Sequence, residues 1–573
     1  MNLPCNPHKY SHLFLKAMTN QQTPILLSDE QIQRFIADGF IVINSDLEDA
    51  LHARISEEVA YALEHELPHP GDNIVPRVPA LNEVCDSAAV QGALISLLGD
   101  QFAFLPHRFP HNSEPLNQTD IIEPFDGQPK MASGSISAAT WHQDGHAFCG
   151  RTRWHRPRAA NIFYFPHDTP LQMGPTRLLA GSHLYATLHD IKPEQAVMNV
   201  IPAGSVIVAH FDLGHAGSPN SSDRCRYMVK FVAIRTRSPE SPSWDHKNEE
   251  WQTPIDLQTP NDLPIVWRSI WNWMRGAESL DAIDVPTADA LPGFLSGLQS
   301  PDQQIRLTSL YGAATSGSAA IDSLIKALLQ TAGQDKHKLA DPKNMANYGM
   351  SINHLERFFI ERQFTPEDVA VALGTMGATV VPNLIELLQH NDPWIRLNAV
   401  YALGEMRPAT VAPYIDDICN LLNDPEGCVI RATLDTLCAL GTFSTETVRL
   451  LHGFLARTIP NWKDNDTRKL MLEQIRYLSS LALLAWVSNA GRSSAEVEAA
   501  LIETLKDDNG YPPLIACLAL ERYGSIDGMR AAIYFLRVRC WDSSQNTRSA
   551  LAGGWTQAHR RATLARLAAN REA

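Results

Sequence analysis

The residues best suited to chemistry are two histidines and one aspartate. His142 and Asp144 stand two residues apart, and His215 follows much later in the chain. Two imidazoles and one carboxylate can occupy one face of an iron ion and leave three positions open, which oxygen activation requires. A His-x-Asp pair alone is a weak signal, because the chain has 21 histidines and such a pair arises easily by chance.

An arginine at a regular distance from the last of these histidines strengthens the signal. Arg226 lies eleven residues after His215 and opens the apolar run 227–234, which is typical of a buried strand. A guanidinium on such a strand can hold a carboxylate through two parallel charged hydrogen bonds. This order of residues suits the binding of 2-oxoglutarate beside a metal. Arg224 is an alternative to Arg226, since residues two apart on a strand share a face.

Three further histidines compete for roles at this site. His146 is four residues from His142 in an expected strand and loop, and His210 lacks the eleven-residue relation to Arg226. Both are expected to pack near the site or to support its ligands. His183 ends a Gly-Ser-His run and is expected to close a turn.

The surrounding segments predict a β domain that opens with helices. Ser28 with Gln31 forms a capping box, Gly39 ends the first helix, and residues 40–43 form a short apolar strand. From about residue 102 to residue 234, short β-rich runs alternate with Gly, Pro, Asn and Asp. This pattern favours an all-β barrel or sandwich.

The C-terminal half has a repetitive helical pattern. Residues 387–404 and 421–441 share an apolar helix, an Asp-Pro turn, and a second helix with Arg near its start and Ala-Leu-Gly at its end. The copies are offset by 32 residues at the Pro and 37 at the Gly. A weaker copy begins at Ser300, and a degenerate one lies near 507–523. Paired helices at this period resemble HEAT repeats. An irregular helical bundle is the alternative.

A tryptophan-rich segment connects the two halves. Residues 238–250 are rich in Ser, Pro and charge, which indicates the end of the β domain. Trp267, Trp271 and Trp273 follow, and such a cluster is expected to pack between domains. We therefore predict three parts, namely residues 1–245, a connecting segment at 246–285 and a repeat domain at 286–573.

The composition restricts the class of protein. The chain of 573 residues is too long for one core, and its 44% hydrophobic and 19% charged residues are globular values. A net charge of -15 argues against binding to nucleic acid or anionic membranes. The nine cysteines include no Cys-x-x-Cys pair and are expected to be reduced. We find no signal sequence or membrane-length apolar run, so a cytoplasmic location is expected.

Several motifs together resemble the phytanoyl-CoA dioxygenase family. The motifs are the run 141–146, the run 174–176 followed by 180–183, and the segment from Ala203 through His215 to Arg226. With the helix and strand at 28–43, they cover about residues 25–240. The resemblance implies a double-stranded β-helix, of the jelly-roll or cupin-like kind, with flanking helices. We expect this domain to be joined to an α-solenoid of HEAT-type repeats.

The resemblance also implies roles for individual residues. His142, Asp144 and His215 are expected to bind Fe(II), and Arg226 to hold the distal carboxylate of 2-oxoglutarate. Related halogenases have a small residue where Asp144 stands. The implied reaction is therefore hydroxylation of a C–H bond with O2, with release of succinate and CO2.

The remaining expectations concern ligands and partners. Thr140 and Ser218 are candidates for a second polar contact with 2-oxoglutarate. Trp141, Phe148 and Trp154 are candidates either to line the substrate site or to pack in the core. The expected substrate is a small molecule or a carrier-linked metabolite, and the repeats offer a surface for a protein partner. The alternatives are a scaffold with an inactive oxygenase domain, and a protein hydroxylase that recruits its substrate through the repeats.

Overall fold

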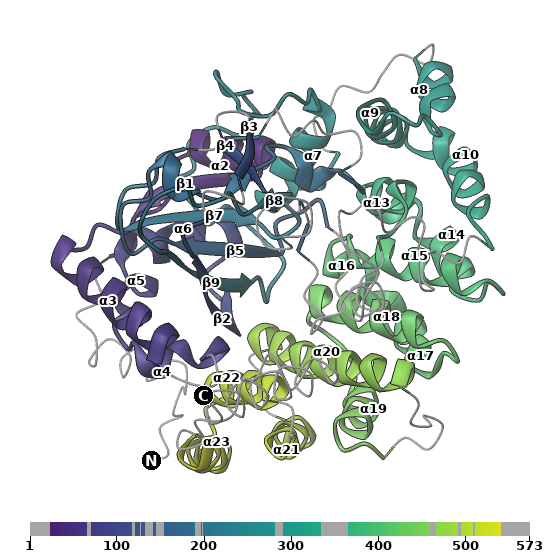
Figure 1. Cartoon of the computed structure of the whole chain (residues 1–573). Helices are drawn as coiled ribbons and strands as arrows, with labels where there is room; N and C mark the ends of the chain where they lie inside the picture. Colours follow the sequence, from purple (N-terminus) through teal and green to yellow (C-terminus); the bar gives the residue numbers. More distant parts are fainter. Residues whose placement is uncertain are drawn as a thin grey trace.

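A β domain and an array of helices make up the part of the chain that the structure describes. The structure is a computed structural model and describes residues 23–65, 70–116, 121–125, 128–131, 141, 143–144, 154–188, 196–197, 199–280, 290–333, 365–458, 466–490, 494–507 and 510–539. The helical array curves around one side of the β domain (Figure 1).

A five-stranded antiparallel sheet is the centre of the β domain. In spatial order its strands are β1 (Phe40–Asn44), β7 (Ser205–His210), β5 (Ala159–Tyr164), β9 (Arg226–Ile234) and β2 (Ala103–Ser113). The short pairs are β3 (Ile121–Phe125) with β4 (Gln128–Met131), and β6 (Arg177–Leu178) with β8 (His215–Ala216). The predicted apolar strands 40–43 and 227–234 are confirmed as parts of β1 and β9.

The two faces of this sheet belong to different apolar clusters. On β5, Ile162 and Tyr164 join the large core of the molecule, whereas Phe163 joins a small separate cluster. On β9, Val229 joins the large core and Met228 the small cluster. This alternation follows from the two-residue period of a strand. We call the face with the small cluster the inner face.

Helices from the N-terminal part of the chain pack beside the central sheet. They are α2 (Asp29–Asp38), α3 (Asp49–His65), α4 (Ile74–Arg77), α5 (Leu81–Cys85) and α6 (Ala88–Leu98). The predicted capping box is confirmed, because Ser28 and Gln31 exchange hydrogen bonds between side chain and backbone. Gly39 ends α2 with φ +84°, and a Cβ there would lie 2.4 Å from His183 Nδ1. Both the conformation and the space therefore require glycine.

The C-terminal half is helical throughout its described ranges. The helices are α7 (Pro264–Met274), α8 (Leu291–Gly297), α9 (Gln303–Thr315), α10 (Ser318–Leu329), α13 (Asp368–Thr375), α14 (Val381–Leu387), α15 (Pro393–Gly404), α16 (Pro408–Val411), α17 (Ile415–Asn420), α18 (Gly427–Leu440), α19 (Thr445–Leu455), α20 (Asp466–Ala490), α21 (Ala495–Thr504), α22 (Tyr511–Tyr523) and α23 (Ile526–Arg539). The predicted helices after the two Asp-Pro turns are α15 and α18. None of the helices in these ranges is long and apolar enough to cross a membrane.

A recurring ion pair joins successive helix pairs. Arg396 on α15 binds Asp424, which precedes α18, with 2.7 Å between Nε and Oδ2. Its Nη1 also donates to the carbonyl of His390 in its own turn, at 2.8 Å. Arg476 on α20 binds Asp507, which precedes α22, in the same way at 2.8 Å. Arg396 therefore ties its own turn to the start of the next helix pair.

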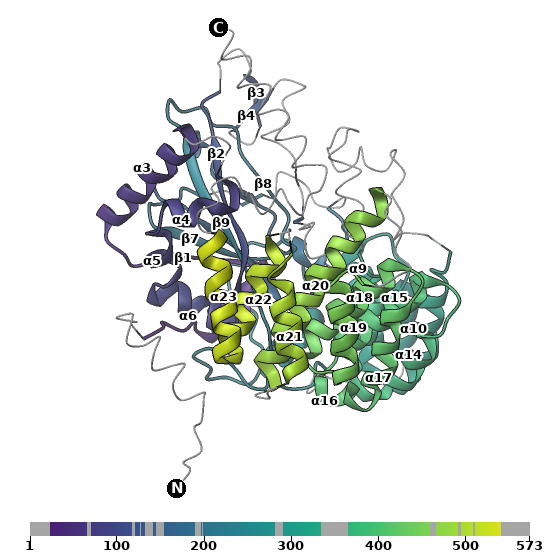
Figure 2. The same ribbon diagram turned by 90° about the horizontal axis from the view of Figure 1, so that it is seen from below.

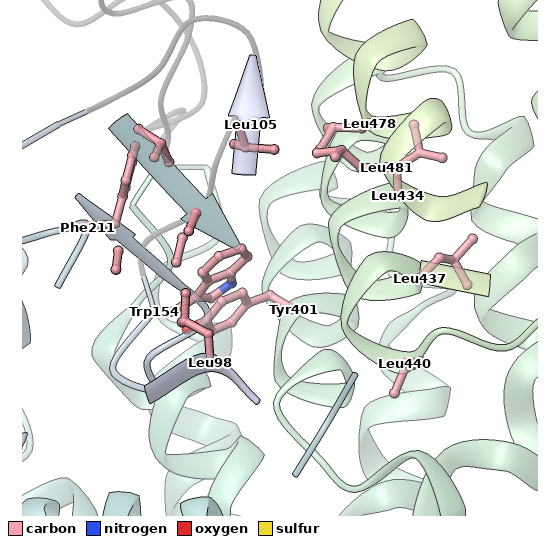
Figure 3. Packing of buried hydrophobic residues seen from close by; sticks show 14 of the residues in the cluster. Leu98, Leu105, Trp154, Phe211, Tyr401, Leu434, Leu437, Leu440, Leu478 and Leu481 are labelled. Atoms are coloured by element: carbon pink, nitrogen blue, oxygen red, sulfur yellow. The ribbon is translucent and has the colours of Figure 1, made fainter. Parts of the chain in front are cut away.

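The β domain and the helices share one continuous core. Figure 3 shows Leu98, Leu105, Trp154 and Phe211 of the β domain facing Tyr401, Leu434, Leu437, Leu440, Leu478 and Leu481 of the helices. A cavity of about 40 Å³ lies between them. Trp154 lines this cavity, so it packs between the β domain and the helices, in line with the packing alternative from the sequence.

Charged side chains close the same interface. Glu405, at the end of α15, accepts a hydrogen bond from Arg158 at 3.2 Å and pairs with Arg156 at 3.4 Å. Trp273 of α7 has the guanidinium carbons of Arg156, Arg158 and Arg235 between 5.2 and 5.3 Å from its ring centre. Trp273 therefore packs between the β domain and the helices, as predicted, whereas Trp271 packs on Trp244 and Trp267 on Trp251.

The last helices of the array also contact the β domain. α22 packs beside β2, as Figure 2 shows from below. Tyr511 donates to Asp72 at 2.5 Å, and Arg522 donates to the carbonyl of Phe102 at 2.8 Å. The array therefore touches the β domain at both ends and along its middle.

Candidate functional site

Asp144 and His215, far apart in sequence, meet in the structure. Asp144 Oδ2 lies 3.5 Å from His215 Nε2, and the side chains are 11% and 9% exposed. His215 opens β8, and its Nδ1 lies 2.9 Å from the carbonyl of Leu213. Because a carbonyl only accepts hydrogen bonds, Nδ1 carries the proton of the neutral ring. In the neutral ring, Nε2 is therefore the nitrogen with a lone pair, and it is the nitrogen that faces the Asp144 carboxylate.

This pair fits a metal ion. Two ligands at right angles, each about 2.1 Å from a metal, are roughly 3 Å apart. The observed 3.5 Å between Asp144 and His215 is close to that separation, and imidazole with carboxylate is a donor set that suits Fe(II). His142 lies outside the described residues. Within the described ranges, no third His, Cys, Asp or Glu completes a metal site.

Two polar side chains of the central sheet hold Asp144 in place. Asn161 Nδ2 donates to Asp144 Oδ2 at 2.8 Å, and the ammonium of Lys230 forms an ion pair with the same oxygen. Asn161 and Lys230 are both buried. Sequence reasoning missed both residues, although each is a polar residue within an apolar strand. Such a residue is buried only where a partner compensates it, and that was the available signal.

Arg226 is a buried cation at the start of β9. Its Nη1 donates to the carbonyl of Gly174 at 2.7 Å, and its Nε has no hydrogen-bond partner within the described part of the chain. Among the described residues, no carboxylate forms an ion pair with it. Burial lowers the pKa of Arg226 to about 10, so the guanidinium stays protonated at neutral pH. Arg224, the alternative from the sequence, is exposed.

Ser218 lies beside the same turn as Arg226. A Cβ on Gly174 would come within 2.6 Å of the Ser218 carbonyl oxygen, and Gly174 has φ +71°. The backbone of Ser218 and the guanidinium of Arg226 therefore both approach Gly174, and Ser218 is buried there. Thr140 lies outside the described residues.

One short turn ties the two ligand-bearing segments together. Gln143, next to Asp144, donates to the carbonyls of Ser182 and Tyr185 at 3.1 and 2.9 Å. The hydroxyl of Ser182 accepts a hydrogen bond from Gly214 N, next to His215, at 2.7 Å. The Gly-Ser-His run singled out in the sequence therefore contacts the neighbours of both Asp144 and His215.

The competing histidines that the structure describes have structural contacts. His183 Nε2 lies 3.1 Å from the carbonyl of Ile36, which agrees with the expected turn role. His210 Nδ1 accepts from Asp212 N at 3.2 Å, and its Nε2 lies 3.4 Å from the carbonyl of Arg156. Both rings are therefore oriented by backbone groups.

Of the aromatic residues singled out near His142 and Asp144, Trp154 lies at the interface with the helices and Trp141 lies beside the β6–β8 pair. Trp141 lies under Arg177, with 4.9 Å from the guanidinium carbon to the ring centre. Arg177 pairs with Ala216 in the β6–β8 ladder, so Trp141 lies close to the strand that carries His215. His146 and Phe148 lie outside the described residues.

Solved non-heme oxygenases are similar to part of this chain. The non-heme monooxygenase ThoJ, in its apo form, is 20% identical over 39% of this chain and 85% of its own, with a TM-score of 0.25. EvdO2 from Micromonospora carbonacea var. aurantiaca, complexed with 2-oxoglutarate, is 16% identical over 37% and 93%, with a TM-score of 0.29. SnoK, a carbocyclase from nogalamycin biosynthesis, is 17% identical over 38% and 88%, also with a TM-score of 0.29. Similarity at this level carries no argument about the reaction.

Two sequence families match the chain. Residues 124–228 match the phytanoyl-CoA dioxygenase family, and this range contains Asp144, His215 and Arg226. Residues 367–438 match HEAT repeats, and this range contains the Arg396–Asp424 ion pair. No curated protein matches the chain.

Proposed function

Because residues 124–228 match the phytanoyl-CoA dioxygenase family and residues 367–438 match HEAT repeats, we propose that this chain hydroxylates a C–H bond of a small-molecule or carrier-linked metabolite. Similarity of residues 124–228 to this family supports a reaction that uses Fe(II), 2-oxoglutarate and O2. One observation carries the proposal for this chain. Oδ2 of Asp144, whose side chain is 11% exposed, lies 3.5 Å from Nε2 of His215.

The proposed ligands of iron are His142, Asp144 and His215. Bound iron would supply the activation of O2, with 2-oxoglutarate converted to succinate and CO2. The protein's part is to orient the ligands. The Leu213 carbonyl directs His215 Nε2 toward the site, and Asn161 holds the Asp144 oxygen. This role of neighbouring groups is common around metal ligands.

Arg226 is the proposed partner of the distal carboxylate of 2-oxoglutarate. It is buried, protonated at neutral pH, and without a carboxylate partner among the described residues. A buried cation of this kind is stabilised by an anion that enters the site. Ser218 and Thr140 remain candidates for the second contact. The central sheet and the β6–β8 pair are, in this proposal, the two facing sheets of a double-stranded β-helix.

Asp144 favours hydroxylation over halogenation. A halogenase of this family type has a small residue at this position, so that halide can bind the metal. Here the carboxylate lies beside His215 and is held by two further side chains, Asn161 and Lys230. The ligand position is therefore taken by the protein.

In this proposal, the repeat domain has a structural role in the enzyme. Their inner helices are buried against the β domain, so this face is not available to a protein partner. We retain the division into residues 1–245, 246–285 and 286–573 as a proposal for the domain limits. An α-solenoid is the proposed architecture of the last part.

An anaerobic titration tests the proposed function. Addition of Fe(II) and then 2-oxoglutarate to the apoprotein should produce the weak visible charge-transfer band of an iron–2-oxoglutarate chelate. The band should be lost in His215→Ala and retained in His65→Ala, which removes an exposed histidine outside the site. Well-folded wild-type protein that binds iron but shows no band would contradict the proposal. Iron-dependent turnover of 2-oxoglutarate would separately contradict an inactive scaffold.

A further inference from the structure

Lys230 lies at the candidate metal site, and the function proposed above gives it no role beyond its contact with Asp144. Its ammonium contacts Asp144 Oδ2, which is the same oxygen that faces His215 Nε2. The Lys230 side chain is 7% exposed, and its Nζ lies 5.4 Å from the ring centre of Phe163. A buried ammonium needs an anion close by. Asp144 supplies that anion.

A metal ion and the Lys230 ammonium would therefore both contact the same oxygen, Asp144 Oδ2. A divalent cation between Asp144 and His215 would lie close to the ammonium, and like charges at such a distance repel strongly in a protein interior. Lys230 should therefore weaken the binding of a divalent cation when no anion binds beside that cation.

An anion beside the metal reverses this effect. Lys230 and Arg226 lie on the same face of β9, because side chains alternate along a strand, and Met228 between them belongs to the inner cluster. Their Cα atoms are separated by four residues, or roughly 13 Å of strand. Long side chains at the two ends of this span can each reach one end of a dicarboxylate. 2-Oxoglutarate carries the two negative charges that would compensate both cations.

We propose that Lys230 is a positioning residue that couples metal binding to 2-oxoglutarate binding. It opposes the binding of Fe(II) alone and stabilises Fe(II) together with 2-oxoglutarate, because its ammonium then pairs with the anionic cosubstrate in addition to Asp144. This inference rests on the proposed function. The coupling between two ligands is the same whichever of them binds first, so it can be measured from the metal alone.

The test is the dissociation constant of Fe(II), measured by anaerobic calorimetry without and with saturating 2-oxoglutarate. The ratio of the two constants is the coupling. In Lys230→Met, Fe(II) alone should bind more tightly than in wild type, and the ratio should fall by about tenfold or more. Both changes follow from removal of a single buried positive charge.

Three further variants isolate the charge. Lys247→Met removes an exposed lysine, paired with Asp245 at the surface, and should leave the ratio unchanged. Lys230→Arg keeps a cation at the site and should keep most of the coupling. Lys230→Gln keeps a hydrogen-bond donor for Asp144 without the charge. It should reproduce the loss of coupling even if Lys230→Met fails to fold.

The outcomes separate this inference from the proposed function. A ratio within about twofold of wild type in folded Lys230→Met or Lys230→Gln, or weaker binding of Fe(II) alone in these two variants, would overturn the coupling role. Wild-type protein that binds neither Fe(II) nor 2-oxoglutarate would contradict the proposed function itself, and this inference with it.

Discussion

At the scale of single residues, one carbonyl directs the chemistry of His215. Leu213 O accepts from Nδ1, so the lone pair of Nε2 faces Asp144. Burial distinguishes Arg226 from Arg224 in a similar way. Arg226 is buried and has no carboxylate partner among the described residues, whereas Arg224 is exposed. Local backbone contacts and burial, rather than residue type alone, therefore separate candidate site residues from their neighbours.

Arg226→Met should weaken the binding of 2-oxoglutarate. Loss of a charged hydrogen-bonding partner is expected to cost about 1.5 to 3 kcal/mol, or roughly 10- to 150-fold in the dissociation constant. The dissociation constant of 2-oxoglutarate is measured by anaerobic calorimetry on the iron-loaded protein. Arg224→Met is the matched control, because Arg224 is exposed, and its affinity should match wild type. The reverse result would show that Arg224 is the clamp.

Asn161→Ala should weaken iron binding without removing it. Asn161 donates to Asp144 Oδ2 at 2.8 Å but is not itself a proposed ligand. Loss of such an orienting hydrogen bond is expected to raise the dissociation constant of the metal by roughly 10- to 100-fold. Equilibrium dialysis with Fe(II) under anaerobic conditions gives the constant. An unchanged constant in a folded variant would show that Asp144 is oriented without Asn161.

At the scale of elements, the Arg–Asp pairs explain why the repeats stack in register. Arg396 binds both carboxylate oxygens of Asp424, at 2.7 and 2.8 Å, and the pair is 11% and 4% exposed. Asp424 in turn holds the backbone N of Glu426 at 2.9 Å, at the start of α18. One side-chain pair thus orients the turn and the helix that follows it.

Arg396→Met should destabilise the array. It leaves the buried carboxylate of Asp424 without its partner, which is expected to cost about 2 to 4 kcal/mol. The midpoint of urea unfolding, followed by the helical circular dichroism signal, should fall. Arg449→Met is the control, because Arg449 and Glu446 form an exposed pair at 64% and 73%, and it should leave the midpoint unchanged. Equal effects of the two variants would contradict this account.

At the scale of the whole molecule, the helices complete the core of the β domain. Residues of the outer sheet face and of α18 and α20 belong to one apolar cluster (Figure 3). Glu405 bonds with Arg158 and Arg156 across the same interface, with a side chain 3% exposed. We therefore expect the two halves to depend on one another for stability.

Glu405→Ala should destabilise both halves together. Removal of the carboxylate leaves two buried guanidinium groups without their shared partner, which is expected to cost about 3 to 5 kcal/mol. The tryptophan fluorescence and helical signals should shift to lower urea concentration by the same amount. A shift in the helical signal alone would indicate independent domains.

Deletion of residues 286–573 should abolish stable folding of the β domain. The deletion exposes the apolar outer face of the sheet, including Leu105 and Phe211, to water. The fragment is expected to aggregate or to lose its near-ultraviolet circular dichroism. A monomeric fragment that still binds 2-oxoglutarate would show that the repeats are dispensable for the fold.

The sequence by itself determined the candidate ligands, their order and the type of each main element. His142, Asp144, His215 and Arg226 were accessible because metal and anion binding restrict residue types and spacing. The strands and the first helix were accessible because side-chain periods and capping residues are local signals.

Only the tertiary structure decided which distant side chains meet. Lys230 and Asn161 lie on neighbouring strands of the sheet, and both contact Asp144. No local pattern records contacts between residues so far apart in the sequence. It also decided that Trp154 packs against the helices, because that contact depends on how two domains join. Burial likewise distinguished Arg226 from Arg224, since the two occupy the same face of the extended chain but only Arg226 lies inside the folded sheet.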